Sequence, residues 1–343
     1  MTESTVLSLQ TLLGRVERIF TGAGLSPEQA GAVTRVIVAG ERDGCKSHGI
    51  YRIEGCLRSL AAGKVKPRAE PQLIDDGSAV IRVDARGGFS PLAFETGAPV
   101  LAERARSLGI AALAINDCLH FSALWPEIEA LNARGVAALA MCPSYTSVAP
   151  AGGIRALFGT NPIAFGWPRQ DGPPYVFDFA TSVAARGEIE LHRLAGTPLP
   201  DGWAIDADGM PTTDPDAALG GAMLPFGGHK GSAISTMIEL LAGAMIGDLT
   251  SPEAWERLGS MALLPSHGEL VIAFCPERFA AGRGDPQVRA ESLFAAILGQ
   301  GARLPSQRRF AARARAAAEG IALSAAEVAM LDRLGRDGLS EPA

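Results

Sequence analysis

Apolar residues recur every three or four positions through most of the first 63 residues of the chain. This spacing predicts a helix over residues 6–23 and another over residues 50–62. Between them, Ser26 precedes a proline and a glutamine in the pattern of an N-cap, a first helical position and a capping box, so a helix is predicted over residues 27–43. The N-terminal region is therefore predicted to be helical.

The pattern changes after Pro71. Two short apolar runs, residues 72–74 and 79–83, flank an Asp-Asp-Gly turn and predict a β-hairpin. Continuous apolar runs at 110–115 and 136–141, separated by a helical segment, are typical of buried strands in an α/β layer. Further strands are predicted at 163–165, 175–177 and 270–274, and further helices at 94–108, 121–134, 184–194, 232–246, 288–298 and 310–334. The fold class is therefore predicted to be α/β.

Composition narrows the range of functions. The chain has 343 residues and a net charge of −6 with no long basic run, which disfavours nucleic acid as a partner. The N-terminus lacks the pattern of a signal peptide, and no run of about 18 uncharged apolar residues predicts a membrane span. Five scattered cysteines without a C-x-x-C pair, and five histidines without H-E-x-x-H, predict reduced thiols, a cytoplasmic location and no metal site.

The segment 46–52, Lys-Ser-His-Gly-Ile-Tyr-Arg, is the first candidate for chemistry. If it is helical, His48 and Arg52 lie four residues apart on one face. Arginine binds a carboxylate through two parallel hydrogen bonds, and histidine gives or takes a proton near neutral pH. The pair indicates a small acid whose reacting carbon adjoins its carboxylate, although a solvated surface pair has the same spacing. No G-x-S-x-G motif surrounds Ser47, so a serine hydrolase is disfavoured.

Four other places offer ligand contacts, each with a structural alternative. The glycine-rich segment 227–232 leads into a helix whose free N–H groups, beside His229 and Lys230, suit a phosphate or carboxylate, and an ordinary glycine loop reads the same way. Asp178 ends a predicted strand and is either a site residue or a cap for a helix beginning near Ser182. Thr160 lies in a turn where it could contact a carboxylate.

The fourth place is a basic cluster in an acidic protein, formed by Arg303, Arg308 and Arg309. A phosphate-bearing ligand would explain the cluster, and a solvated helix start would explain it as well. The chain has no G-x-G-x-x-G sequence between a strand and a helix, so a Rossmann cofactor domain is not indicated.

Taken together, these segments resemble the malate/L-lactate dehydrogenase family of NAD(P)-dependent oxidoreductases, which lack a Rossmann fold. The matches run in order along nearly the whole chain: Ser47-His48-Gly49 with Arg52, His120-Phe121, Val148-Ala149-Pro150, Gly159 to Pro162, Asp178 to Ser182, Pro211 to Pro215, His229-Lys230-Gly231 and Arg303-Leu304-Pro305. Within the family, residues 120–126 and 224–232 are similar to the Δ1-piperideine-2-carboxylate/Δ1-pyrroline-2-carboxylate reductases.

The resemblance implies roles for individual residues. His48 would be the proton donor, Ser47 its relay partner, Arg52 the ligand of the substrate carboxylate and Thr160 a second substrate contact. NADP would contact His120, Phe121, Ser122, Ala123, Leu124, Asp178, Phe179, Ala180, Arg186, Gly187, His229, Lys230, Arg303, Leu304, Pro305, Ser306, Gln307 and Arg308. The sequence departs from the common family pattern at Ser122, where a glycine is usual.

The resemblance also implies a domain plan. It consists of a helical domain of residues 1–70 joined by C-terminal helices in 307–340, and an NADP-binding and substrate region of residues 71–306. The latter would be built on a non-Rossmann, largely antiparallel or mixed sheet flanked by helices, with helix 229–247 in a separate helical subdomain. A homodimer is implied as well.

The leading hypothesis is an NADPH-dependent reductase of small cyclic imino acids. A 2-hydroxy acid dehydrogenase acting on malate, lactate or a relative, with NAD as a possible cofactor, would use the same residues on a keto group. A ligand-binding protein that kept the fold without catalysis is a third hypothesis, and the joint presence of Ser47, His48 and Arg52 argues against it.

Overall fold

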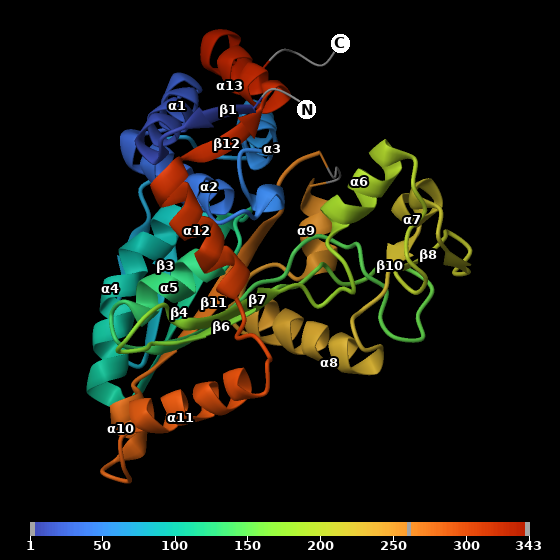
Figure 1. The fold of residues 1–343 in the computed structure, drawn as a ribbon. Coiled ribbons are helices and arrows are strands. Elements are labelled where there is room, and N and C mark those ends of the chain that lie inside the picture. Colours follow the sequence, from blue (N-terminus) through green and yellow to red (C-terminus); the bar gives the residue numbers. More distant parts are fainter. Residues whose placement is uncertain (1–3, 259–261, 340–343) are drawn as a thin grey trace.

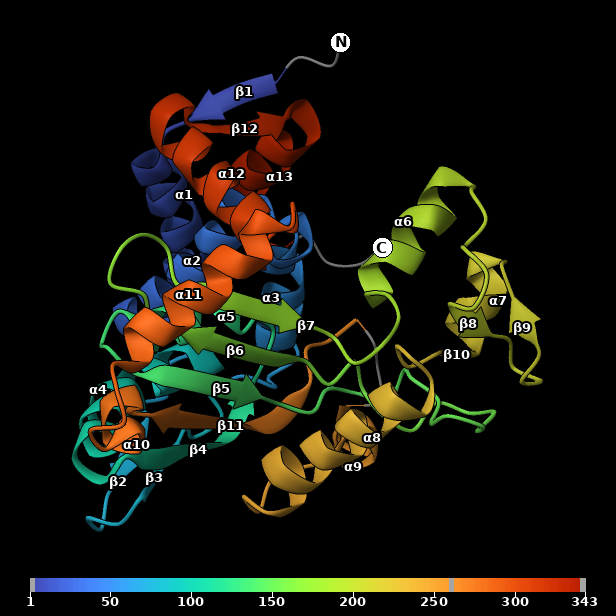
Figure 2. The ribbon, with the colours of Figure 1, turned by 60° about the horizontal axis from the view of Figure 1, so that its bottom comes forward.

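A seven-stranded mixed sheet runs through the centre of the molecule (Figures 1 and 2). The fold was obtained as a computed structural model, which describes residues 4–258 and 262–339. Only β3 and β4 pair in parallel, and the other neighbours are antiparallel. The strands, in spatial order, are β2 (Gln72–Ile74), β3 (Val80–Asp84), β4 (Ile110–Leu119), β11 (Ser266–Phe274), β5 (Ala137–Met141), β6 (Ile163–Trp167) and β7 (Tyr175–Phe179). The predicted mixed, largely antiparallel sheet is confirmed.

The predicted hairpin is present, because β2 pairs antiparallel with β3. The strand, helix and strand predicted within residues 110–141 are present as β4, α5 (Trp125–Asn132) and β5. Strands β4 and β5 are not neighbours, since β11 lies between them and pairs antiparallel with both. Apolar runs show that each strand is buried, but they do not specify which distant strand lies beside it.

Helices cover both faces of the sheet. On one face α4 (Ser90–Leu108) and α5 (Trp125–Asn132) pack on the strands through a shared apolar core. Helix α4 approaches closely, because a Cβ at Gly97 would lie 2.7 Å from the side chain of Leu113. On the other face lie α8 (His229–Ile238) and a π-helix continuing it (Glu239–Ala244), so the helix predicted at 232–246 begins three residues earlier.

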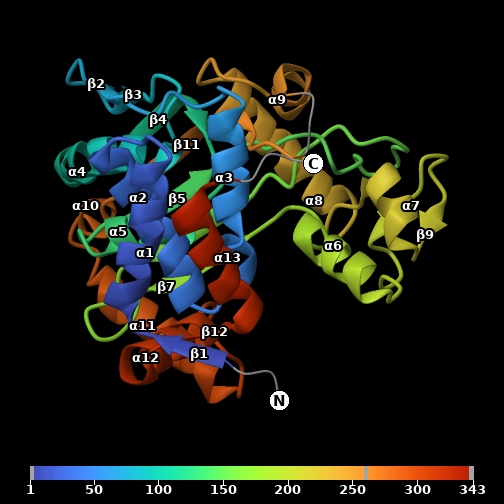
Figure 3. The ribbon, with the colours of Figure 1, turned by 90° about the horizontal axis from the view of Figure 1, so that it is seen from above.

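The two ends of the chain pack together (Figure 3). Strand β1 (Ser4–Leu7) pairs with β12 (Ile321–Ser324), and α1 (Leu9–Gly22) lies against α13 (Ala325–Asp337). The helix predicted from residue 6 is therefore wrong at its start, because Ser8 caps α1 and leaves Val6 in a strand. The single helix predicted at 310–334 is two, α12 (Gln307–Glu319) and α13, separated by Gly320 and β12.

The remaining elements complete the N-terminal helices and an outlying lobe that projects from the sheet (Figures 1 and 2). Helices α2 (Pro27–Arg42) and α3 (Arg52–Ala61) share a core with α1, and Ser26 caps α2 as predicted. The lobe contains α6 (Arg186–Ala195), α7 (Pro215–Gly220) and the short strands β8 (Ala204–Ile205), β9 (Pro211–Thr212) and β10 (Ala222–Met223). Helices α9 (Ser251–Leu258), α10 (Pro276–Ala280) and α11 (Pro286–Gly299) connect or flank the sheet.

The predicted domain division, at residues 70 and 306, stays a prediction. None of the described helices combines the length and apolarity that crossing a membrane would require.

Candidate active site

The segment 46–52 folds as two short pieces. Residues Lys46–His48 form a 3-10 turn and Arg52 begins α3, with Gly49 between them in a non-helical conformation (φ −88°, ψ −145°). The expectation that His48 and Arg52 share one helical face is therefore wrong. The two side chains are still close enough for the charge of Arg52 to act on the imidazole.

The buried carboxylate of Glu41 holds this turn in place. Glu41 accepts a hydrogen bond from the backbone N–H of Ile50 at 3.0 Å and forms an ion pair with Lys46. Two glycines allow this approach, because a Cβ at Gly49 would lie 2.0 Å from the Glu41 carboxylate, and one at Gly40 would lie 2.3 Å from the carbonyl oxygen of His48. The position of His48 is thus set by helix α2.

His48 is partly buried and held on two sides. Its Nδ1 lies 3.0 Å from the hydroxyl oxygen of Ser47, and its ring meets Trp125 edge to face at a centroid distance of 6.2 Å. Burial, then the positive charges of Arg52 and His120, lower the pKa of His48 from 6.5 to about 3. The chain's own groups therefore keep this imidazole neutral at neutral pH.

Arg52 has hydrogen-bonding capacity to spare. Its buried Nε has no hydrogen-bond partner among the described residues, and its guanidinium carbon lies 5.9 Å from the ring centroid of Tyr51. A buried guanidinium donor without an acceptor costs free energy, which a bound carboxylate would recover.

An ionic network ties His48's neighbour Trp125 to the C-terminal helices. The Trp125 indole N–H donates to Asp43 Oδ2 at 3.2 Å, and Arg309 lies over the Trp125 ring at 4.9 Å. Arg309 and Arg313 from α12 both form ion pairs with Asp43 and with Glu129. Arg309, one member of the predicted phosphate-binding cluster, is thus buried in an internal network, whereas Arg303 and Arg308 are exposed.

Asp178 caps a helix, but the helix is α5 and not the one expected to begin near Ser182. Its Oδ2 accepts hydrogen bonds from the backbone N–H groups of Leu124, at 2.8 Å, and Trp125, at 3.0 Å, at the start of α5. Burial raises the pKa of Asp178 to about 6, against the opposing effect of these two hydrogen bonds. The cap fixes the predicted cofactor segment 120–124 against the end of β7.

The segment 120–124 is buried throughout, and one polar atom in it is unsatisfied. Ser122 Oγ has no hydrogen-bond partner among the residues described. Phe121 packs edge to face on Phe89, 5.6 Å between centroids, which anchors the segment in the core shared with the N-terminal helices. The His120 side chain faces the sheet interior, with Nε2 3.5 Å from Glu269.

The other residues predicted to bind cofactor or substrate lie on several different elements. Ser306 donates a hydrogen bond to the carbonyl oxygen of Val176 at 2.7 Å, which fixes the 303–308 segment beside β7. The Phe179 ring packs edge to face on Phe226, the residue before the glycine-rich segment, with 5.7 Å between ring centroids. His229 and Lys230 are exposed on the first turn of α8. The carbonyl of Thr160 accepts from the Thr181 N–H at 2.8 Å, next to β7.

Arg186 and Gly187 are the exception. They form the first turn of α6 in the outlying lobe. No hydrogen bond or ring contact found within residues 4–258 and 262–339 links them to the group around His48.

The described residues fit a nicotinamide cofactor better than they fit a metal ion. Ser122 Oγ and Arg52 Nε are buried polar atoms without hydrogen-bond partners among the described residues. The free N–H groups expected at the start of α8 are largely absent, because the backbone N–H groups of Lys230, Gly231 and Ser232 donate to nearby carbonyl oxygens. A buried group of His120, Cys142 and His267 has the ligand types of a zinc site. However, Cys142 Sγ lies 3.9 and 4.0 Å from the His120 nitrogens, wider than the roughly 3.6 Å expected between two ligands of tetrahedral zinc. The expected absence of a metal stays a prediction.

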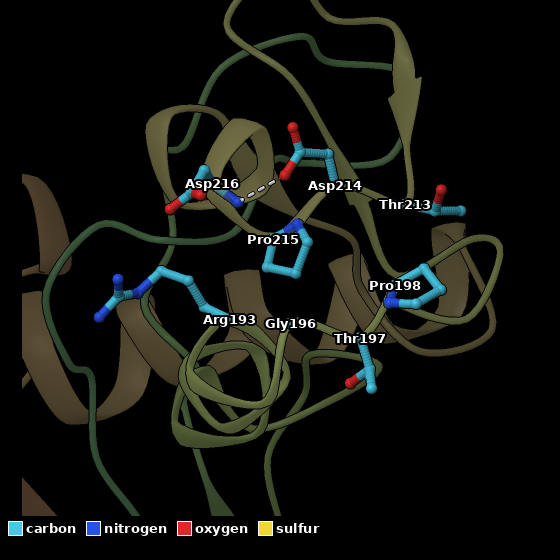
Figure 4. A pocket seen from close by; sticks show the side chains of 8 residues that line it. All are labelled: Arg193, Gly196, Thr197, Pro198, Thr213, Asp214, Pro215 and Asp216. Carbon is cyan, nitrogen blue, oxygen red and sulfur yellow. Dashed lines mark hydrogen bonds between the residues drawn. The ribbon is translucent and has the colours of Figure 1, made fainter.

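Two surface hollows lie elsewhere. One of about 360 Å³ is in the outlying lobe, where Asp214 caps α7 by accepting from the Asp216 N–H (Figure 4). The other, of about 670 Å³, is lined by residues including Lys66 and Asp117. Neither hollow is lined by a predicted site residue. We therefore place the candidate site among the residues around His48 and not at a surface hollow.

Several residues of this centre were not predicted from sequence. Asp43, Trp125 and Glu41 position the turn and the imidazole, and Glu127 and Glu269 lie behind His120. A carboxylate directly before a buried apolar run, such as Glu269 before residues 270–274 of β11, was a visible signal of an internal partner.

Comparison with known proteins gives consistent results. A sequence model described as malate/L-lactate dehydrogenase matches residues 7–332. The chain is 67% identical over 341 residues to a Δ1-pyrroline-2-carboxylate reductase of Agrobacterium fabrum, covering 99% of each chain. It is 57% identical to a Δ1-pyrroline-2-carboxylate/Δ1-piperideine-2-carboxylate reductase of Pseudomonas aeruginosa, covering 89% of this chain and 92% of that one.

A solved structure is also closely similar. The crystal structure of Δ1-piperideine-2-carboxylate reductase from Pseudomonas syringae pv. tomato superposes with a TM-score of 0.92 at 44% identity. The match covers 96% of this chain and 99% of that one.

The ionic network predicts a stability effect for Asp43→Asn. The change removes the carboxylate that Arg309 and Arg313 share and leaves them only Glu129, so the free energy of unfolding should fall by about 3 kcal/mol at pH 7. Hydrogen bonds from Arg313 and Arg42 outweigh burial and lower the pKa of Asp43. Its contribution is therefore present above the unfolded pKa of about 3.9 and is lost as pH falls through the lower folded value. Denaturant unfolding at pH 7 and pH 3 measures both effects.

Asp332→Asn is the matched control, because Asp332 pairs with Arg15 at 3.0 Å on the exposed surface. Its effect should stay below about 1 kcal/mol. Equal losses in the two variants would contradict a special role for Asp43.

Proposed function

Because the chain belongs to the malate/L-lactate dehydrogenase family, we propose that it is an NADPH-dependent reductase of small cyclic imino acids. It is an oxidoreductase that uses a nicotinamide cofactor. The proposed reactions convert Δ1-pyrroline-2-carboxylate to L-proline and Δ1-piperideine-2-carboxylate to L-pipecolate. The observation that carries the proposal is the buried Arg52 donor without a partner, next to an imidazole held by Ser47, in a chain so similar to named reductases.

The substrate carboxylate would bind Arg52, which has the free donor that this anion requires. Binding would fix the ring so that its C=N carbon faces the cofactor, with Thr160 as a second contact. The negative charge would also offset the field of Arg52 at His48, one of the causes that lower the pKa of the imidazole. The affinity of His48 for a proton would therefore rise when substrate binds.

A bound nicotinamide supplies the hydride that reduces the imine carbon. As the C=N bond is reduced the ring nitrogen becomes more basic, and His48 would give its proton to that nitrogen. The Ser47 hydroxyl, 3.0 Å from Nδ1, can donate to the neutral ring or accept from the imidazolium. Ser47 would thus hold the ring in place in both charge states.

The cofactor would lie along three segments gathered near β7: residues 120–124, 178–180 and 303–308, with His229 and Lys230 on its phosphates. The exposed Arg303 and Arg308 support NADPH over NADH, because the 2′-phosphate adds a charge that arginine binds well. Arg186 and Gly187 would take part if the lobe contacts the cofactor. We further propose a cytoplasmic homodimer; exposed apolar side chains on the π-helix and just after it, at Leu240 and Met245, offer a surface that a second copy could cover.

A substrate panel tests the proposal. Oxidation of NADPH is followed with piperideine-2-carboxylate, pyrroline-2-carboxylate, pyruvate and oxaloacetate, and then with NADH in place of NADPH. We expect the two imino acids to be reduced with kcat/KM at least about 100-fold above the two keto acids. Preference for a keto acid would favour the 2-hydroxy acid dehydrogenase hypothesis, and no activity with any compound would favour a ligand-binding protein.

Arg303→Ala gives the control for cofactor choice in the same assay. KM for NADPH should rise while KM for NADH changes little, because only NADPH carries the 2′-phosphate. An equal change in both values would remove Arg303 from recognition of that phosphate.

His48→Ala is expected to lower kcat at least about 100-fold, the usual contribution of a general acid, while NADPH binding measured by fluorescence stays close to wild type. The matched control is His192→Ala. His192 lies on α6 in the outlying lobe, and its Nδ1 forms a hydrogen bond with the hydroxyl of Thr197 five residues along the chain. Unchanged turnover in His48→Ala would remove His48 from the mechanism.

A further inference from the structure

A compact group of buried ionisable side chains lies behind the segment 120–124, on the side facing the sheet. It joins His120, Glu127 of α5, and His267 and Glu269 of β11, with Cys142 just after β5. All five side chains are buried, and Glu269 has no exposed surface. The mechanism proposed above gives the two carboxylates no task.

The two carboxylates cannot both be ionised without a large cost. Neither carboxylate oxygen of Glu127 or Glu269 has a hydrogen-bond donor within the described part of the chain. The acceptor atoms of the pair and one nitrogen of His120 all lie within 4.8 Å of one another. Two buried like charges at this distance repel, and protonating one of them creates the donor that the other lacks.

The surroundings decide which carboxyl keeps the proton. Burial, followed by the negative charge of Glu269, raises the pKa of Glu127 well above its usual value. Burial also opposes ionisation of Glu269, but the proximity of Glu127 and His120 outweighs it and lowers the pKa of Glu269. Glu127 is the acid and Glu269 the carboxylate.

The imidazole of His120 lies against the Glu269 carboxylate. Its Nε2 lies 3.5 Å from Glu269 Oε2. The other histidine, His267, uses Nδ1 on the carbonyl of Gly268 at 2.8 Å, and burial followed by the charge of His120 lowers its pKa to about 3. His267 is therefore neutral, which leaves His120 as the imidazole of this group that lies within ion-pair distance of Glu269.

We propose that Glu127 and Glu269 share one proton, and that the ionised Glu269 holds His120 as an imidazolium whose positive charge faces His48. The link to turnover rests on the proposed function, whereas the charge states themselves do not. Glu127, Glu269 and His120 are positioning residues in this account. Together with Arg52, the His120 charge keeps His48 neutral in the free enzyme and attracts the anionic substrate.

The ionisable groups around His120 come from every element that packs on it. They are His48 of the 3-10 turn, Cys118 of β4, Glu127 of α5, Cys142 after β5, Asp178 of β7, and His267 and Glu269 of β11. Burial raises the thiol pKa values of Cys118 and Cys142 well above the usual range, so neither thiol carries charge near neutral pH. Among the groups named here, Glu269 is the carboxylate for which an ion-pair distance to His120 is found.

Two isosteric variants separate the carboxyl groups. In Glu269→Gln the carboxylate is gone, so His120 should become uncharged at pH 7. In Glu127→Gln the amide N–H₂ replaces the acid O–H as donor to Glu269, so His120 should stay charged. The measurement is ¹⁵N NMR of histidine-labelled free enzyme, which distinguishes neutral from charged imidazoles; His120→Gln assigns the signal, and thermal unfolding verifies that each variant folds.

The wild-type spectrum is decisive even if a variant fails to fold. An uncharged His120 in the wild type would overturn the proposal, as would loss of its charge in Glu127→Gln together with retention in Glu269→Gln. Elemental analysis adds a third outcome, because one equivalent of zinc or another transition metal would mean that an ion, and not a shared proton, joins the carboxylates.

Kinetics then test the link to substrate. Glu269→Gln should raise KM for pyrroline-2-carboxylate by about three- to tenfold, the size of one partly screened charge interaction, with a smaller rise in Glu127→Gln. Equal KM values in the wild type and Glu269→Gln would overturn the electrostatic role. Because the NMR experiment contains no substrate, its failure is distinguishable from failure of the proposed function.

Discussion

The buried carboxylate of Asp43 joins three parts of the chain that are distant in sequence. It lies at the end of α2, accepts a hydrogen bond from the Trp125 indole at the start of α5, and pairs with Arg309 and Arg313 of the C-terminal α12. Trp125 in turn packs on His48, and Arg309 packs on Trp125. A single buried charge therefore positions the proposed proton donor, the 120–124 segment, and the start of α12 with the loop before it, which carry Arg308 and Arg303. Because a buried carboxylate is stable only with such partners, the network fixes the geometry of all three together.

Around that network the site keeps some of its polar capacity unused. Arg52 Nε and Ser122 Oγ are buried without hydrogen-bond partners in the part of the chain that the structure describes, and burial followed by two nearby positive charges holds His48 neutral. These features are costly to the folded protein alone and become favourable when an anion and a cofactor bind. The arrangement accounts for why an acid substrate would activate its own proton donor, since the carboxylate offsets the field that keeps His48 neutral. The proton that we propose Glu127 and Glu269 to share would act in the same way, because it leaves Glu269 charged beside His120, and the charge of His120 acts on His48.

The sequence predicted local features well and long-range partners poorly. The start of α2 at Pro27, the hairpin around residues 75–77 and most helices follow from caps, turns and periodicity, which are properties of neighbouring residues. The insertion of β11 between β4 and β5, the pairing of β1 with β12 and the cap that Asp178 makes on α5 depend on residues far apart along the chain. The local geometry expected for the segment 46–52 was wrong, because Gly49 interrupts the helix that the spacing of His48 and Arg52 indicated. Arg309 shows the same limit, since a cluster of arginines does not reveal which member is buried.

The most direct test of the central claim is a crystal structure of the enzyme with NADP⁺ and the product L-proline. The account predicts that the proline carboxylate lies on the Arg52 guanidinium within hydrogen-bonding distance, and that the ring nitrogen faces His48. The reacting carbon should lie against the nicotinamide, which would contact residues 120–124. A carboxylate bound away from Arg52, or a ring nitrogen facing away from His48, would contradict the assignment of these two residues and with it the mechanism built on them.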